Sequence, residues 1–296
     1  MNHTPKVSVL MLTYNQEAYV DEAIRSVMLQ RTDFDFELVV GDDCSTDETA
    51  ARCRVWKDNY PRQIRLLERE RNMGLIANFM DTYARCNGEY IAICEGDDFW
   101  TDATKLQRQV DFLEAHSDYV LCFHRVINYY ADKGTKSLSN GGQKPDLDIL
   151  DYARSNPISN VSAVFRRYPV EELPEWFSTV KTYDYPLHLL NAQRGKLHYM
   201  PRPMAVYRKH SKGIWSVSGS RKQTEIALSV RALLIGYFKE KGRPDVAGAL
   251  QETYDRIAAN AARREARPKQ AFTMKTALSK LRAAVSYFIP LPRIKG

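Results

Sequence analysis

The sequence has few of the residues that define several classes of protein. Its 296 residues include 14 glycines, 13 prolines and five cysteines, which excludes collagen-like, low-complexity and disulfide-scaffold chains. The cysteines are odd in number and form no Cys-x-x-Cys pair, so we expect neither a zinc site nor a disulfide framework. No apolar run approaches the roughly 18 residues of a membrane span, and the first residues lack a signal-peptide core. These absences predict a cytoplasmic protein.

Two common phosphate-binding signatures are also missing. No G-x-G-x-x-G follows the first predicted strand, and no G-x-x-x-x-G-K-[ST] occurs in the chain. Both motifs use glycine-rich loops to bring backbone N–H groups to phosphates. Their absence disfavours an ordinary dinucleotide-binding protein and a P-loop NTPase.

Positive charge is concentrated at the C-terminal end. The formal net charge is +7, yet the residues from Arg263 onward include nine basic side chains and one acid, a net +8. The rest of the chain therefore carries −1 and is close to neutral. A nucleic-acid partner for the main domain is not expected, because such a surface needs a basic patch.

The first half alternates between short apolar runs rich in β-branched residues and amphipathic helical patterns. This alternation is typical of a parallel sheet with helices on both faces, where ligands bind at the carboxyl ends of the strands. The predicted strands are Val7–Thr13, Phe36–Val40, Ile64–Leu67 and Tyr90–Cys94, and the predicted helices cover 20–28, a segment from Asp47, Leu75–Ala84 and Lys105–Ala115.

The second half is less regular, and its pattern predicts a second part of the same α/β domain followed by helices. We expect a long strand or strand pair at Tyr119–Tyr130, a loop at Lys133–Gln143, strands in Pro157–Arg167 and Leu197–Tyr207, and helices at Arg221–Lys239 and Pro244–Arg263.

Three carboxylates lie within four residues after the fourth predicted strand, at Glu95-Gly96-Asp97-Asp98. Such acids repel one another unless a cation lies between them, and Mg²⁺ or Mn²⁺ prefers oxygen ligands of this kind. The glycine permits close approach of a backbone or ligand. The alternative is a solvated acidic turn before a helix.

Two more acids, Asp42 and Asp43, end the second predicted strand. A carboxylate at this edge can accept a hydrogen bond from the imide N–H of a uracil or thymine base. The alternative is a helix-capping run, which accounts for Thr46 or Asp47 but not for both earlier acids.

Taken in order, four segments resemble family 2 glycosyltransferases of the GT-A fold. They are V-S-V-L-M-L-T-Y-N-Q at Val7–Gln16, G-D-D-C-S-T-D-E-T at Gly41–Thr49, R-N-M-G at Arg71–Gly74 and C-E-G-D-D-F-W at Cys94–Trp100. Later segments, Tyr183–Leu187 and Val206–Gly213, are similar to acceptor-side motifs of bacterial non-processive members, and the Q-x-x-R-W motif of processive synthases is absent. The resemblance implies an inverting enzyme with an α/β GT-A sheet.

The resemblance also implies roles for individual residues. The family's D-x-D triplet falls on Glu95-Gly96-Asp97, with glutamate where aspartate is usual. Asp97, Asp98 and His210 would hold Mn²⁺ or Mg²⁺, and Arg208 could neutralise phosphate. The implied nucleotide-sugar contacts are Thr13, Tyr14, Asn15, Glu17, Asp42, Asp43, Asn72, Gly74, Glu95 and Gly96.

Asp184 is the candidate catalytic base. An attacking hydroxyl must lose a proton to a carboxylate. The acids at the strand ends are already assigned to the nucleobase, the ribose and the metal, so a different acid is needed. Asp184 precedes Pro186 and an apolar helix; the residues alone favour a helix N-cap, and the resemblance reverses this preference in favour of the base. Asp146, Asp148 and Asp151 are rival acids beside a predicted loop.

The last segment carries an apolar stripe, from Met274 to Ile289, together with the surplus basic residues. A basic amphipathic helix is typical of an element that lies on an anionic membrane surface. The alternative is a helix docked on the protein body or on a second subunit of a homo-oligomer. We expect a cytoplasmic protein peripheral to the inner membrane face.

Three parts are therefore predicted: a GT-A domain at 1–220, with a nucleotide-sugar half (1–115) and an acceptor half (116–220), a helical extension at 221–262 and a basic tail at 263–296. The expected function is metal-dependent transfer of a sugar, most simply from a UDP-sugar, to a hydroxyl of a glycan or lipid-linked acceptor in bacterial cell-surface polysaccharide synthesis. One alternative is a nucleotidyltransferase, but the glycine-rich loop with Arg or Lys that is expected after the first strand of such an enzyme is missing from this sequence. The other alternative is a non-catalytic sugar-nucleotide-binding module.

Overall fold

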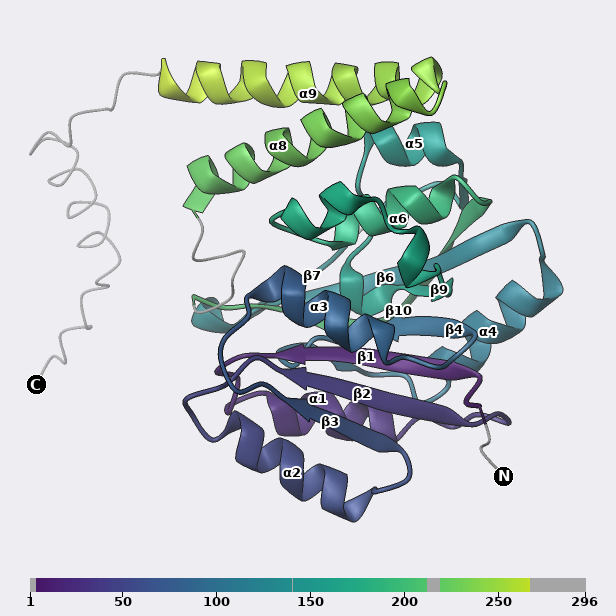
Figure 1. The fold of residues 1–296 in the computed structure, drawn as a ribbon, viewed down its shortest axis with the longest axis vertical. Helices are drawn as coiled ribbons and strands as arrows, with labels where there is room; N and C mark the ends of the chain where they lie inside the picture. The colour runs from purple at the N-terminus through teal and green to yellow at the C-terminus, as the bar shows by residue number, and fades with distance from the viewer. Residues whose placement is uncertain (1–3, 140, 212–218, 267–296) are drawn as a thin grey trace, which may run out of the picture. The chain divides into compact units, whose positions relative to one another are not determined.

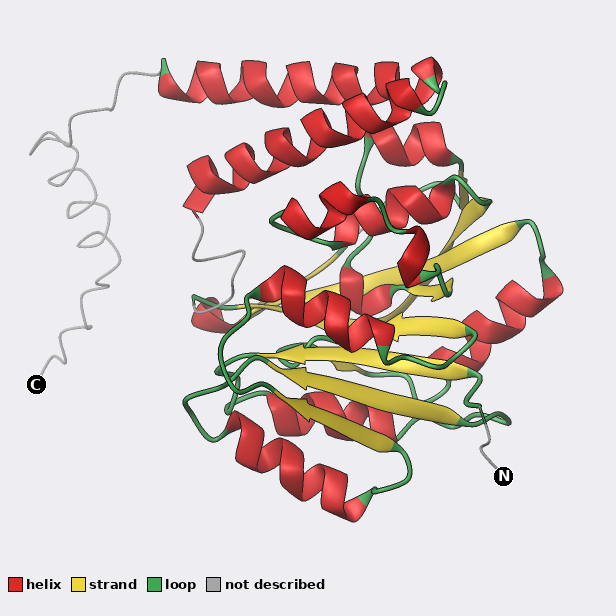
Figure 2. Ribbon diagram, in the orientation of Figure 1, coloured by secondary structure: helices red, strands yellow, loops and turns green. Residues whose placement is uncertain are grey.

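One mixed β-sheet runs through the protein, and helices cover both of its faces (Figures 1 and 2). The structure is a computed structural model and describes residues 4–139, 141–211 and 219–266. The strand order in the sheet is β3-β2-β1-β4-β9-β6-β10-β5, with β7 paired to β6 and β8 paired to β10.

Four neighbouring strands of the first half run parallel, as the apolar runs predict. They are β1 (Val7–Thr13), β2 (Phe36–Asp42), β3 (Ile64–Glu68) and β4 (Tyr90–Ile93). Every residue of β1, β2 and β4 is buried, which is why these strands are mostly apolar rather than strictly alternating. Their carboxyl ends therefore lie at one edge of the sheet.

The second half completes the sheet with strands of both directions. β9 (Val164–Arg166) lies antiparallel between β4 and β6 (Tyr119–Tyr130), and β10 (Lys196–Lys209) runs parallel to β6. Short strands β5 (Phe99–Trp100) and β8 (Asp146–Leu147) pair antiparallel with β10. Since β6 and β10 have the direction of β4, the end of β10 reaches the same edge as Thr13 and Asp42.

The helices divide between the two faces and bury two apolar cores. Val7, Val9 and Met11 of β1 face the first core, whereas Leu10 and Leu12 face the second. The first core is covered by α1 (Val20–Met28), α2 (Thr49–Asn59) and α4 (Lys105–Ala115); the second by α3 (Leu75–Ala84), α5 (Ile149–Arg154), α6 (Asp184–Ala192), α8 (Gly219–Glu240) and the first half of α9 (Pro244–Glu265).

The structure confirms the predicted α/β class and its C-terminal helices, and it differs from several of the predicted elements. The expected loop at Lys133–Gln143 contains β7 (Thr135–Leu138), an exposed strand that pairs with β6 after a turn at Gly134. Only Val164–Arg166 of the predicted Pro157–Arg167 strand is extended into the sheet. α2 begins at Thr49, whose N–H donates to the Asp47 carboxylate, rather than at Asp47.

The chain divides into two compact units, residues 1–257 and 258–296, and the division falls inside α9. The predicted basic amphipathic segment from Met274 to Ile289 lies outside the described residues. Within the described part of the chain, no helix combines the length and the apolarity that crossing a membrane requires.

A fully buried lysine lies in the first core. The Lys105 amine is 4.2 Å from the centre of the Trp100 ring and has no hydrogen-bond partner among the described residues. Burial lowers the pKa of this amine from 10.5 to about 7. At a pH between these two values the amine is charged in the unfolded chain and mostly neutral in the folded protein. Folding then has to remove a proton from it, which lowers the stability of the protein.

We expect Lys105→Met to stabilise the protein by roughly 1–3 kcal/mol at pH 7, because the variant avoids desolvating the amine. Between pH 7 and 9 the Lys105 amine stays protonated in the unfolded wild type and loses its proton in the folded protein, so the stability of the wild type rises with pH. That rise should be smaller in Lys105→Met. Urea unfolding at both pH values measures it, with exposed Lys57→Met as the control; a less stable Lys105→Met would contradict the expectation.

Candidate active site

The loops that follow β1, β2 and β4 are joined by backbone hydrogen bonds at the carboxyl edge of the sheet. The N–H of Asp43 donates to the Thr13 carbonyl at 3.0 Å, and the N–H of Gly96 donates to the Leu12 carbonyl at 3.1 Å. The candidate nucleotide-binding segments therefore form one continuous surface.

Asp42 holds this edge together from inside. Its carboxylate accepts from the Thr13 hydroxyl at 3.0 Å and from the Ser45 N–H and hydroxyl at 3.0 and 2.6 Å, and the residue is buried. Thr13 and Asp42 thus bind each other and shape the loop, and their side chains are turned away from solvent.

The loops after β1 and β2 are also tied by Asn15 and Glu17. The Asn15 side-chain oxygen accepts from the Thr46 N–H at 2.8 Å, and Glu17 accepts from the Glu48 N–H at 3.1 Å. Asn15 has φ of 53°, a left-handed conformation that asparagine tolerates. Tyr14 lies between Thr13, the last residue of β1, and Asn15. It is 43% exposed and presents an aromatic ring to solvent.

Asp43 organises the loop before α3. Its two carboxylate oxygens accept from the N–H groups of Met73 and Gly74 at 2.7 and 2.9 Å. Gly74 has φ of 82°, which explains the glycine at this position, and its N–H also contacts the Asn72 side chain at 3.1 Å. The sequence-predicted residues Asp43, Asn72 and Gly74 therefore meet, although Asp43 lies 31 residues before Gly74.

Glu95, Asp97 and Asp98 form a compact acidic cluster after β4. One carboxylate oxygen from each lies within 4.8 Å of the others. Burial, followed by the charge of Asp97, raises the pKa of Glu95 to about 7 and the pKa of Asp98 well above its usual range. Asp98 is fully buried, whereas Asp97 is partly exposed.

Arg208, near the end of β10, donates hydrogen bonds to this cluster. The Arg208 N–H donates to Asp98 Oδ1 at 2.7 Å, and its guanidinium donates to the Asp97 carbonyl and to Glu22, each at 2.5 Å. The guanidinium also lies over the Tyr19 ring, 4.6 Å from its centre. Arg208 is buried and paired, so it supports the acidic loop; its contact with phosphate stays a prediction.

His210 faces the cluster from the same strand end. Its Nε2 is 3.0 Å from Asp97 Oδ2, and the residue is 6% exposed. Its Nδ1 and the Oδ2 of Asp98 are buried and have no hydrogen-bond partner among the described residues. The predicted metal residues Asp97, Asp98 and His210 are thus brought together by the fold.

The donor set suits the predicted cofactor. Carboxylate oxygens with one imidazole are ligands that Mn²⁺ accepts, and Mg²⁺ prefers the oxygens. A divalent cation would offset the repulsion that raises the pKa values of Glu95 and Asp98. Asp97 and His210 would hold it, since their polar atoms meet at the partly exposed side of the cluster.

The candidate base belongs to the acceptor half and lies near the cluster. Asp184 is the first residue of α6, and its charge contributes to the raised pKa of Glu95. The alternative reading of Asp184 as an N-cap is not supported, because Tyr183 occupies the cap position and makes no side-chain cap bond. The Asp184 carboxylate instead accepts from the Thr182 hydroxyl.

The three rival acids have other partners. Asp148 and Asp151 form a reciprocal capping box at the start of α5, and Asp151 also pairs with Lys144. Asp146 bonds to His198 at 2.7 Å. All three therefore serve the local structure.

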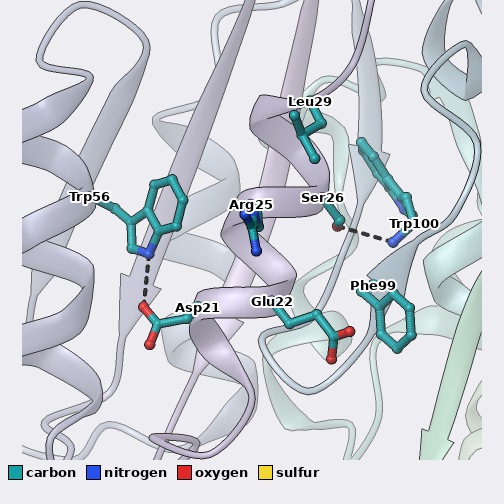
Figure 3. A pocket seen from close by; sticks show the side chains of 8 residues that line it. All are labelled: Asp21, Glu22, Arg25, Ser26, Leu29, Trp56, Phe99 and Trp100. Carbon is teal, nitrogen blue, oxygen red and sulfur yellow. Dashed lines mark hydrogen bonds between the residues drawn. The ribbon is translucent and has the colours of Figure 1, made fainter.

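A separate pocket of about 760 Å³ lies between α1, α2 and β5 (Figure 3). Its lining includes Glu22, which accepts a hydrogen bond from the Arg208 guanidinium. The same guanidinium contacts the Asp97 carbonyl, so the pocket lies next to the acidic loop. Trp100, which also lines the pocket, is only 4% exposed, and its indole N–H donates to the Val161 carbonyl at 3.0 Å. Trp100 is therefore a core residue.

Sequence reasoning missed two polar side chains that contact Glu95. Tyr183 Oη donates to Glu95 at 2.7 Å, and Asn160 Nδ2 donates to it at 3.2 Å. Tyr183 was visible only as a neighbour of Asp184, and nothing in the sequence relates Asn160 to the site. Their separations from Glu95, 88 and 65 residues, explain why.

These features define a mostly parallel α/β protein with an acidic, metal-type site at the carboxyl edge of its sheet. The profile of the family described as Glycosyl transferase family 2 matches residues 8–212. The chain belongs to this family, as the sequence motifs indicate.

Two curated relatives illustrate the family. An uncharacterised protein of Mycobacterium tuberculosis is 38% identical over 211 residues, which cover 71% of this chain and 60% of the relative. A Bacillus subtilis protein provisionally named as the teichuronic acid biosynthesis glycosyltransferase TuaG is 30% identical over 116 residues, 39% of this chain and 45% of that protein. The chain thus spans about 60% of the length of the mycobacterial relatives that it matches.

Solved structures show the same fold at low identity. Staphylococcus aureus TarS, in complex with UDP-GlcNAc, has a TM-score of 0.59 at 20% identity and covers 77% of this chain and 66% of its own. A mannosyltransferase of Pyrobaculum calidifontis, in complex with GDP-Man and Mn²⁺, has a TM-score of 0.56 at 18% identity, covering 97% and 82%. The predicted GT-A fold is therefore confirmed.

Gly96 tests how tightly the strand-end loops are packed. A Cβ on Gly96 would lie 2.4 Å from Gln16 Oε1 and 2.6 Å from Thr13 Cγ2. We expect Gly96→Ala to destabilise the protein by roughly 1–3 kcal/mol, because side chains of the loop must move. Gly248→Ala in α9 is the control, since a Cβ there meets nothing within 4 Å and should stabilise by about 0.5–1 kcal/mol. Equal stability of wild type and Gly96→Ala in urea unfolding would contradict this packing.

Proposed function

We propose that this chain is a metal-dependent, inverting glycosyltransferase that moves a sugar from a UDP-sugar to a hydroxyl of a glycan or lipid-linked acceptor. The observation that carries the proposal is the meeting of two kinds of acid from distant parts of the chain. The cluster of Glu95, Asp97 and Asp98 follows β4, and Asp184 on α6 comes directly after Tyr183, whose hydroxyl donates to Glu95 at 2.7 Å. Membership of family 2 supports the reaction class.

The chemistry needs these acids for different reasons. Cleavage of the bond to a nucleoside diphosphate places negative charge on the leaving group, and a bound divalent cation supplies the Lewis acid that stabilises it. The attacking hydroxyl must lose a proton, which Asp184 accepts. A single direct displacement, with Asp184 as the base, inverts the anomeric centre, and the resemblance to family 2 implies the same course.

The nucleotide part of the proposal depends on Asp43 and Tyr14. Each oxygen of a carboxylate has two acceptor positions, so Asp43 can hold the Met73 and Gly74 N–H groups and still accept from a uracil imide. The exposed ring of Tyr14 offers a face on which a base can stack. Solved relatives of the same fold contain UDP-GlcNAc and GDP-Man, so the base must be tested directly.

The proposed acceptor is reached at a membrane surface. The basic residues from Arg263 onward and the apolar stripe favour contact with anionic lipid, where a lipid-linked acceptor is available. TuaG, provisionally named for teichuronic acid biosynthesis, supports a role in bacterial cell-surface polysaccharide synthesis. We propose that residues 1–220 form the transferase domain, 221–262 its helical extension and 263–296 a tail that faces the membrane or a second subunit. We also propose that the enzyme is cytoplasmic.

The decisive binding experiment is calorimetry of UDP and GDP with and without Mn²⁺. We expect UDP to bind more tightly when Mn²⁺ is present, and Asp97→Asn to lose that enhancement because the amide lacks the charge that holds the cation. Exposed Asp58→Asn is the control and should behave as wild type. Wild-type Mn²⁺ affinity in Asp97→Asn would exclude Asp97 as the ligand, and tight GDP binding without UDP binding would exclude the uridine assignment.

The base is tested by turnover. Asp184→Asn should lower transfer by roughly 10²–10⁴-fold while nucleotide and Mn²⁺ affinity stay nearly unchanged, as expected for removal of a positioned general base. Asp151→Asn is the matched control, because Asp151 caps α5 and should affect stability rather than turnover. If Asp184→Asn keeps near-normal turnover while Asp151→Asn loses it, the assignment of the base is wrong.

A further inference from the structure

The first acid of the cluster is hydrogen-bonded to the acceptor half of the protein. Glu95 Oε1 accepts from Tyr183 Oη at 2.7 Å and from Asn160 Nδ2 at 3.2 Å, and Asn160 Nδ2 also lies 2.8 Å from Tyr183 Oη. Glu95 follows β4, Asn160 begins the 3₁₀ turn Asn160–Ser162, and Tyr183 immediately precedes α6. Three segments that are distant in the sequence therefore meet at one carboxylate.

Packing fixes the Tyr183 ring independently of its hydroxyl. The ring stacks on Phe79 of α3, with ring centres 4.0 Å apart and planes 12° apart, and Tyr183 is 2% exposed. The Asn160 side chain is held in turn, because its oxygen lies 3.3 Å from Nε2 of His188, a buried residue of α6. Since these neighbours hold the ring and the amide, the hydroxyl presents one defined position to Glu95.

Glutamate at this position has a structural reason. The side chain of aspartate is shorter by one methylene, about 1.5 Å, which would stretch a 2.7 Å hydrogen bond beyond the distance at which it counts as one. The departure from the D-x-D pattern of the family thus coincides with a partner that only the longer acid reaches.

We propose that Tyr183 is a positioning residue for the transfer reaction. Its hydroxyl bonds the acidic cluster to the N-terminal end of α6 and so sets where Asp184, the next residue along the chain, stands relative to the donor. This inference rests on the proposed function. A displacement of about 1 Å between reacting groups can cost 10²-fold in rate, so one hydrogen bond at this junction has a measurable effect on turnover.

The test is a double-mutant cycle on transfer with Tyr183→Phe, Glu95→Asp and the two combined. We expect Tyr183→Phe to lower kcat roughly 10–100-fold, with donor KM and UDP–Mn²⁺ affinity changed less than about 3-fold. Both single variants break the same hydrogen bond, so the double variant should be no slower than the slower single variant. A double variant in which the two losses multiply would overturn the proposal, as would wild-type kcat in Tyr183→Phe.

Tyr83→Phe is the matched control. Tyr83 is also buried, also stacks on Phe79, at 5.3 Å, and also donates from its hydroxyl, but to the Tyr168 carbonyl and away from the cluster. It should lower the unfolding temperature as much as Tyr183→Phe does and leave kcat unchanged. An equal fall of kcat in both variants would show a general packing effect and overturn the positioning role.

The failure of this inference differs from the failure of the proposed function. If wild type transfers sugar and Asp184→Asn does not, while Tyr183→Phe retains full kcat, only the positioning role is wrong. If wild type fails to turn over any nucleotide-sugar, or Asp184→Asn retains its rate, the proposed function is wrong and the positioning role falls with it.

Discussion

Repulsion among three carboxylates at the edge of the sheet is the constraint on which the rest of the site depends. Glu95, Asp97 and Asp98 have oxygens within 4.8 Å of one another, and burial and mutual repulsion raise the pKa values of Glu95 and Asp98. An arrangement of this kind persists only when surrounding donors hold it. The backbone N–H of Arg208 bonds Asp98, His210 contacts Asp97, and Tyr183 and Asn160 bond Glu95.

Each of these donors comes from the second half of the chain. The first half supplies the acids and the loops after β1, β2 and β4, which are tied together by Asp42, Asp43 and Asn15. The second half supplies β10 and the start of α6. The electrostatic cost of the cluster is thus partly offset by contacts that also align the two halves, so the same bonds that stabilise the fold set the geometry of the site.

Much of this architecture could be predicted because its signals are local. β1 was predicted with the observed bounds, since seven buried residues leave a continuous apolar run that ends where polar residues begin. The acids after β4 stand out for the same reason. The residues around β7 and β9 were predicted less well: β7 is an exposed hairpin strand with no apolar pattern, and β9 has only three residues.

By itself, then, the sequence determined the α/β class, the family and the segments that form the strand-end edge, because period, burial and spacing are properties of neighbouring residues. Only the tertiary structure decided what the individual side chains do there. Arg208 is buried against Glu22 and the Asp97 carbonyl, where it supports the acidic loop. Tyr183 reaches Glu95 across 88 residues. Such contacts depend on how β10 and α6 approach the end of β4, and no local pattern encodes that approach.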